Sequence, residues 1–110
     1  MEINETRLLG MLGFAMRAGK LIIGTESVCR AMAKGSPTLV LVSLSASEGT
    51  KKKLTVKSEF YGIPHEMLPA SPEKIGALLG KTYAPMALAV TDSGFSEEIK
   101  KALNPIDEQE

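Results

Sequence analysis

The chain has 110 residues, which is enough for one hydrophobic core but too few for two domains. Its single cysteine, Cys29, excludes a disulfide framework and a multi-cysteine metal cluster. The first residues lack the basic start and apolar stretch of a signal peptide, and no apolar run approaches the ~18 residues of a membrane span. We therefore expect a single-domain cytoplasmic protein with no membrane partner.

The charged residues are divided unevenly along the chain, although the formal net charge is zero. Residues 1–57 contain nine lysines and arginines against four acidic residues, whereas residues 58–110 contain four lysines against nine acidic residues. Such a division allows a basic face that binds nucleic acid, but it also arises by chance in many globular domains.

Helical and extended patterns alternate along the whole chain. Helical spacing begins after a predicted N-cap at Asn4, at the turn formed by Gly24 and Thr25, and over residues 47–61, 71–80 and 95–103. Apolar runs predict four short strands at residues 21–23, 38–42, 65–68 and 87–91. This order predicts an α/β fold, namely a three-layer α/β/α sandwich with a mixed four-stranded sheet and about five helices. Residues 1–104 form the predicted domain, and residues 105–110 a frayed acidic tail.

Two predictions concern packing. Gly10 and Gly13 lower the helix propensity of the first helix, and we expect them to let another element approach closely. In the helix predicted over residues 47–61, we expect Leu54, Phe60 and Tyr61 to supply apolar contacts.

The usual signals of an enzyme are weak in this sequence. The only histidine, His65, has no partner histidine or cysteine for a metal site or for Cys–His catalysis. Neither a Gly-x-Gly-x-x-Gly turn nor a phosphate-binding loop ending in Gly-Lys-Ser/Thr is present. We therefore predict no catalytic residue, no metal and no cofactor.

Asp92-Ser93-Gly94 is the one motif that suggests catalysis, because aspartic proteases present their carboxylate in an Asp-Ser/Thr-Gly turn. A chain of this length would have to dimerise to supply the second carboxylate. Those proteases are almost wholly β, whereas this sequence predicts five helices. The preferred interpretation is that Asp92 and Ser93 cap the last helix.

Residues 20–35 contain the strongest candidate site. An apolar strand runs into Gly24, and a helix begins at once with polar side chains in its first turn. Free backbone N–H groups at such a helix start can bind an anion or the edge of a base. Glu26, Arg30 and Lys34 follow at four-residue spacing and share one helix face, where Arg30 could contact guanine or phosphate. A capped helix with a solvated charged stripe is the alternative interpretation.

A second segment, residues 79–94, combines a glycine, a variable loop and an apolar strand that ends near another glycine. Together with residues 18–35, it resembles the two signatures of the ribosomal L7Ae/L30e family, and the short bacterial members of the YlxQ type above all. The similarity extends from residue 7 to about residue 103. Members of this family are α/β/α sandwiches that bind RNA, typically a kink-turn, which is a sharply bent duplex with tandem sheared G·A pairs. The resemblance thus implies RNA, ribosomal or other, as the partner and a role linked to the ribosome.

The resemblance also implies which residues contact the RNA. The family's turn is commonly Gly-Thr-Asn-Glu, so Glu26 stands where the family has asparagine and Ser27 where it has glutamate. The family's next two basic residues correspond to Arg30 and Lys34. The implied RNA-binding residues of this segment are Lys20, Gly24, Thr25, Glu26, Ser27, Arg30 and Lys34.

In the family, the loop corresponding to residues 81–86 packs apolar side chains against an extruded nucleotide. Here the loop offers Tyr83 and Pro85 as such surfaces. The implied contacts of this loop are Tyr83, Ala84, Pro85 and Met86. Coverage of the sheet edge by Tyr83 is the alternative interpretation.

The lysines at 51–53 are expected to form a solvated helix face outside the site; any contribution would be a general attraction for phosphate. The function predicted from these observations is that of a non-catalytic, monomeric RNA-binding protein. A protein-interaction module on the same fold, without RNA affinity, is the alternative, because Glu26 and the second half of the chain are acidic. The dimeric protease is a third hypothesis.

Overall fold

The computed structural model describes residues 4–104, in which five helices and four strands alternate. Their order is α1 (Glu5–Arg17), β1 (Leu21–Ile23), α2 (Thr25–Ala33), β2 (Leu39–Ser43), α3 (Glu48–Phe60), β3 (His65–Leu68), α4 (Pro72–Leu78), β4 (Ala87–Val90) and α5 (Ser93–Leu103). The predicted tail at 105–110 lies outside the described residues. None of the described helices is long and apolar enough to cross a membrane.

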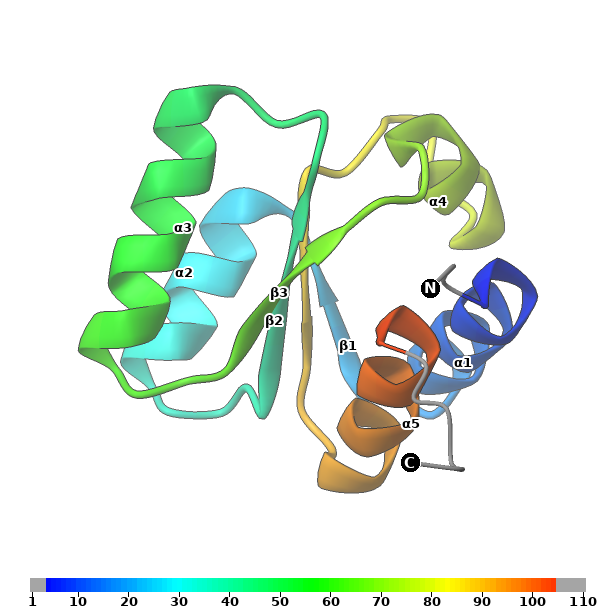
Figure 1. Cartoon of the computed structure of the whole chain (residues 1–110), viewed down its shortest axis with the longest axis horizontal. Coiled ribbons are helices and arrows are strands. Elements are labelled where there is room, and N and C mark those ends of the chain that lie inside the picture. Colours follow the sequence, from blue (N-terminus) through cyan, green and yellow to red (C-terminus); the bar gives the residue numbers. More distant parts are fainter. Residues whose placement is uncertain (1–3, 105–110) are drawn as a thin grey trace.

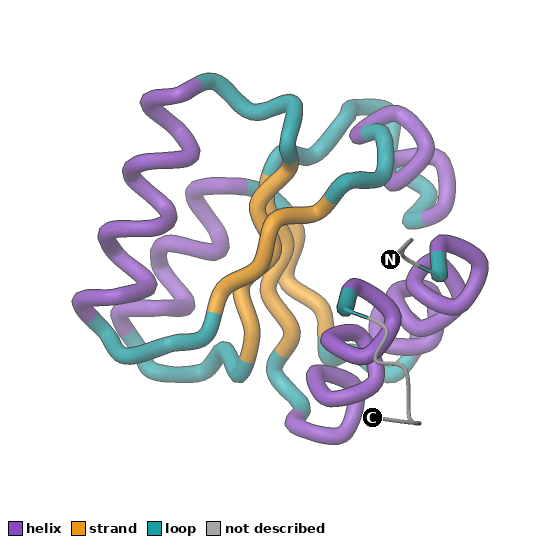
Figure 2. The backbone as a smooth tube through the Cα atoms, in the orientation of Figure 1, coloured by secondary structure: helices purple, strands orange, loops and turns teal. Residues whose placement is uncertain are grey.

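The four strands form one mixed sheet in the order β1-β4-β2-β3. Strand β3 runs parallel to β2, and β4 runs antiparallel to both of its neighbours. Helices α2 and α3 cover one face of this sheet, and α1, α4 and α5 cover the other (Figures 1 and 2). The predicted three-layer sandwich with a mixed sheet is confirmed.

Each face of the sheet has its own hydrophobic core, because successive side chains of a strand point to opposite faces. In β2, Leu39 and Leu41 pack toward α1, α4 and α5, whereas Val40 and Val42 pack toward α2 and α3. All five residues of β2 are buried. The uniformly apolar sequence of this strand is therefore explained by its cover on both faces.

The strands place three helix starts at one end of the sheet. At this end β1, β2 and β3 finish and β4 begins, as the pairs Ile23–Leu88, Val42–Ala87 and Ser43–Leu68 show. We call it the upper end, after its position in Figure 1. Helices α2, α3 and α4 follow those three strands directly, so all three begin at the upper end.

Two of the packing predictions are wrong. A Cβ atom on Gly10 would meet nothing within 4 Å, and one on Gly13 would meet only side chains at 3.4 Å or more, so neither glycine permits a close approach. Phe60 is 79% exposed and Tyr61 is 39% exposed, whereas Leu54 is fully buried. Phe60 follows Leu54 by six residues, which rotates its side chain by about 240° and turns it away from the core.

Asp92 caps the last helix, as predicted, because its Oδ2 accepts a hydrogen bond from the Phe95 N–H at 2.9 Å. Ser93 is the first residue of that helix and not a second cap. The Asp-Ser-Gly motif thus starts a helix on an α/β/α sandwich, and the protease hypothesis fails because its fold is absent.

Candidate nucleic-acid interface

The start of α2 differs from that of every other described helix. Side-chain oxygens cap α1, α3, α4 and α5, supplied by Asn4, Ser47, Ser71 and Asp92. The N-cap of α2 is Gly24, which has no side chain to accept a bond from the helix. The N-terminal N–H groups of α2 are therefore left for an external acceptor.

Gly24 also determines the shape of this turn. Its φ of +105° and ψ of 146° lie where side-chain-bearing residues are strained. The first intrahelical bond runs from the Val28 N–H to the Gly24 carbonyl at 2.9 Å. The N–H groups of residues 25–27 precede that bond, so they point out of the helix at the upper end of the sheet.

Arg30 lies about one turn further along α2 than these N–H groups, and its side chain reaches back toward them. Its Nη2 donates to the Ser27 Oγ at 3.2 Å, and its Nη1 lies 4.0 Å from the Glu26 Oε1. Helical side chains tilt toward the helix N-terminus, which explains this direction. The Arg30 side chain is 68% exposed and that of Glu26 is 87% exposed. Both are accessible to a ligand at the start of α2.

The loop at residues 81–86 lies beside the Gly24 turn, although the two are far apart in sequence. The Gly24 N–H donates to the Ala87 carbonyl at 2.9 Å, which ties the turn to the first residue of β4. The Ser43 N–H donates to the Met86 carbonyl at 2.9 Å, so the end of β2 holds the same loop. The structure thus brings the two predicted segments together at the upper end.

Gly76 in α4 holds the other side of this loop. A Cβ atom on Gly76 would lie 2.3 Å from the Tyr83 carbonyl oxygen and 3.4 Å from Pro85 Cδ. The Gly76 carbonyl accepts a hydrogen bond from the Lys81 N–H at 2.8 Å. The loop therefore packs on the helix backbone, which only a glycine allows at this position.

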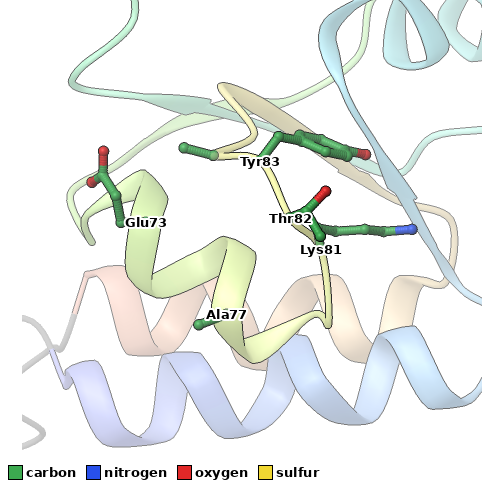
Figure 3. Close-up of a pocket in the computed structure, with 6 residues that line it drawn as sticks. Glu73, Ala77, Lys81, Thr82 and Tyr83 are labelled. Carbon is green, nitrogen blue, oxygen red and sulfur yellow. The ribbon is translucent and has the colours of Figure 1, made fainter.

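The loop side chains divide into exposed and buried ones. Tyr83 is 53% exposed, and with Lys81 it extends to the side of the loop away from Glu73 (Figure 3). A pocket of about 220 Å³ is lined by Glu73, Ala77, Lys81, Thr82, Tyr83 and Ala84. Pro85 is buried, so the expectation that it offers a surface is wrong: its ring packs against Gly76 and supports the loop.

Lys20 and Lys34 do not lie with the other predicted residues. The Lys20 carbonyl accepts from the Thr91 N–H at 3.0 Å, which places Lys20 at the lower end of the sheet, about 13 Å of strand away from Gly24. Lys34 is the C-cap of α2 and lies about 13 Å along the helix from Thr25. Of the two, Lys34 continues the face of Arg30, whereas Lys20 is separated from the site by the whole of β1.

Sequence reasoning missed Gly76, which supports the loop, and the exposure of Leu44. Gly76 lies within an ordinary helical pattern, and only the loop packed on it reveals its role. Leu44 directly follows β2 at the upper end, where its side chain is 51% exposed. The only available signal was an apolar residue just after a buried strand, which does not distinguish a surface from a core position.

Comparison with known proteins tests the resemblance on which the predicted site depends. The model of the ribosomal protein L7Ae/L30e/S12e/Gadd45 family matches residues 6–100. The chain belongs to this family. The matched residues include both the Gly24 turn and the loop at 81–86, which are the two segments that the fold brings together.

Individual family relatives match along most of their length. The chain is 34% identical to the RNA-binding protein YlxQ of Enterococcus faecium, over 93% of this chain and 96% of that protein. It is also 34% identical to the large ribosomal subunit protein eL30 of Pyrobaculum neutrophilum, over 81% of this chain and 88% of that protein. A solved structure of a protein with unknown function from Bacillus halodurans C superposes with a TM-score of 0.80 at 35% identity, covering 87% of this chain and 95% of that one.

Proposed function

We propose that this L7Ae/L30e-family protein is a non-catalytic RNA-binding protein with a ribosome-linked role in the cytoplasm, and that it recognises a kink-turn through the start of α2 and the loop at residues 81–86. The names of its relatives support the general class, because one is an RNA-binding protein and another a ribosomal protein. The kink-turn is the partner that the family resemblance implies.

The uncapped start of α2 is the observation that supports this proposal most strongly. RNA presents phosphate and base oxygens that accept hydrogen bonds, and the N–H groups of residues 25–27 are donors without a side-chain cap. Gly24 adds no side chain that would keep an RNA strand from the backbone. In each of the other four described helices, a side-chain cap accepts from one N–H group of the first turn, whereas at α2 no side chain occupies any of these donors.

The side chains around this turn supply further contacts. Arg30, aimed at the helix start, binds a guanine edge or a phosphate, and Glu26 accepts from base amino groups. Thr25 and Ser27 bring hydroxyl groups to the G·A pairs, and Lys34 attracts a phosphate one turn further along.

The neighbouring loop contributes an aromatic surface. Tyr83 stacks on a base extruded from the bend, while Ala84 and Met86 line the same loop. Pro85 acts only as a support beneath them. Lys20 is not part of the proposed site, because it lies at the other end of the sheet.

A binding titration tests this function. The full chain is titrated with a kink-turn duplex and with a duplex lacking the G·A pairs, at two salt concentrations. Arg30→Ala is compared with Arg17→Ala, which removes the same charge from the last turn of α1, before β1 begins at the lower end. We expect the Arg30 variant to bind the kink-turn more weakly by about 1–3 kcal/mol and the Arg17 variant to bind like the wild type.

The other outcomes separate the alternatives. Equal, salt-sensitive binding to both duplexes would show a basic protein without kink-turn recognition. Absence of binding to either RNA, together with recovery of a protein partner, would favour the interaction module instead.

A further inference from the structure

Helix α3 presents a continuous row of side chains away from the sheet. Positions three and four residues apart lie on the same face of a helix, and the buried Leu54 and Ser58 lie on the opposite face. We call this row the α3 stripe; it consists of Lys52, Lys53, Val56, Lys57 and Phe60. Figure 1 shows α3 on the outside of the α2–α3 layer, and four of the five stripe residues are exposed, with Lys57 half-buried.

The lysines of the α3 stripe have no acidic partner among residues 4–104. The two glutamates of α3 are engaged elsewhere: Glu48 lies 3.5 Å from the Lys51 Nζ, and Glu59 lies 3.8 Å from the His65 Nε2. Lys52, Lys53 and Lys57 form none of the ion pairs in the described part of the chain. Three neighbouring positive charges thus repel one another unless an anion binds between them.

The surface between these lysines is hollowed. A shallow depression of about 440 Å³ is lined by Gly49, Lys52, Lys53, Val56 and Lys57. The space beside Gly49 is open, because a Cβ atom there would meet nothing within 4 Å. The depression therefore offers an apolar floor at Val56 with cations around it.

An exposed aromatic ring ends the stripe. Phe60 is 79% exposed, the highest fraction among the large apolar side chains of the described residues. Tyr61 packs edge-to-face against it, with ring centroids 4.9 Å apart and an interplanar angle of 85°. The ring thus contacts Tyr61 while most of its surface stays exposed, which suits stacking of a base.

We propose that the α3 stripe is a second RNA-binding surface, on which the three lysines contact phosphates and Phe60 stacks on an unpaired base. The proposal extends the proposed function and rests on it for the class of partner. Cations interleaved with an exposed aromatic ring match single-stranded RNA, which offers a charge and a flat base at every nucleotide. Carboxylates of an acidic protein surface would pair with the lysines but would not account for the exposed Phe60 ring.

The position of α3 makes this surface reachable for RNA bound at the first site. Helices α2 and α3 both begin at the upper end of the sheet and pack against each other, with the Ser58 Oγ 3.6 Å from the Met32 Sδ. A helix of 13 residues extends about 20 Å. A strand that leaves the kink-turn can therefore follow α3 away from the upper end over several nucleotides.

The test uses the full chain and two RNAs, a kink-turn duplex with short stems and the same duplex with a single-stranded extension, placed on each strand end in turn. The variant K52A/K53A/K57A is compared with K74A/K100A/K101A, which removes three lysine charges from the opposite layer. We expect the stripe variant to bind the extended RNA at least about tenfold more weakly and to lower the slope of log K against log salt by about two. The control variant should stay within about twofold of wild type.

Substitution of Phe60 tests the stacking contact separately from the charge of the lysines. We expect Phe60→Ala to weaken binding of the extended RNA about fivefold or more while leaving the short duplex unchanged, and Phe60→Trp to restore it. Ultraviolet cross-linking of the wild type to the extended RNA should modify the peptide that contains Phe60. Urea unfolding confirms that each variant is folded.

Failure of this proposal is distinguishable from failure of the first one. Loss of kink-turn selectivity, with no effect of Arg30→Ala, overturns the first site. The stripe is then tested alone with a single-stranded RNA of about 20 nucleotides, which is long enough to cover it. Equal losses in the stripe and control variants would overturn the stripe, as would wild-type RNA affinity in the stripe variant. Capture of an acidic protein that depends on the stripe lysines, with unchanged RNA affinity, would reassign the surface to a protein.

Discussion

The two helical layers differ in how many of their cationic side chains are paired with acidic ones. In the layer of α1, α4 and α5, four of the five cations are paired: Arg7 with Glu98, Lys74 with Glu5 at 3.2 Å, Lys100 with Glu97 at 3.6 Å and Lys101 with Glu98 at 3.7 Å. In the layer of α2 and α3, only Arg30 and Lys51 have an acidic neighbour among the described residues. The formal net charge of zero conceals this difference.

The two layers also differ in whether their ion pairs connect one helix to another. Two of the ion pairs in the α1–α4–α5 layer join different helices, since Arg7 reaches α5 and Lys74 reaches α1. The cations of α2 and α3 join no helices to one another and remain available to an anion. The α1–α4–α5 layer contains Gly76, on which the loop at 81–86 packs, and the α2–α3 layer presents the charges that the proposed function assigns to RNA.

The largest expected effect concerns the α2–α3 layer, which depends on apolar packing because its ion pairs connect no two helices. Leu54→Ala removes a fully buried side chain and should lower the free energy of unfolding by about 2–5 kcal/mol. Phe60→Ala on the same helix should change it by less than about 0.5 kcal/mol, because the ring is exposed. Urea unfolding of both variants measures the contrast. A large loss of stability in the Phe60 variant would mean that the ring has a structural role.

A smaller effect is expected where the α1–α4–α5 layer supports the loop. Gly76→Ala places a methyl group 2.3 Å from the Tyr83 carbonyl oxygen, so the loop must shift, at an expected cost of about 1–3 kcal/mol. RNA affinity should fall together with stability, because Tyr83 is displaced. Gly10→Ala is the matched control: it meets nothing within 4 Å and should stabilise α1 by about 0.5–1 kcal/mol. An equal change in the free energy of unfolding of the two variants would contradict the packing of the loop on Gly76.

The smallest effect tests the ion pairs that connect α1 with α5. The hydrogen bond from Arg7 holds the pKa of Glu98 below its usual value, with the charge of Arg7 and Lys101 adding to the shift. A lowered folded pKa stabilises the protein above the unfolded pKa, and this contribution disappears as the pH falls through the folded pKa. Glu98→Gln should therefore lower stability slightly near neutral pH and not in acid. Urea unfolding at both pH values, with Glu97→Gln for comparison, measures the difference; an equal loss in acid would exclude the ion pair as its cause.

Much of the fold was predictable from residue patterns. The apolar runs at β2 and β4 and the glycine or proline at most helix ends specify local structure through short-range sterics, so element types and order follow from the sequence. The predicted caps at Asn4 and Asp92 are confirmed for the same reason. The contacts made by Gly10 and Phe60 were predicted wrongly, because which face of a helix is covered depends on neighbours distant in the chain.

The sequence by itself determined the alternation of helices and strands, the uncapped glycine before α2 and the family signature in two separated segments. Each of these is a local property of a few consecutive residues. Only the tertiary structure decided that the Gly24 turn meets the loop at 81–86, that Gly76 seats this loop while Pro85 is buried, and that Lys20 is excluded. Strand pairing and the packing of the loop on α4 bring those residues together or separate them, and the local pattern of a segment does not specify which distant segment it will meet.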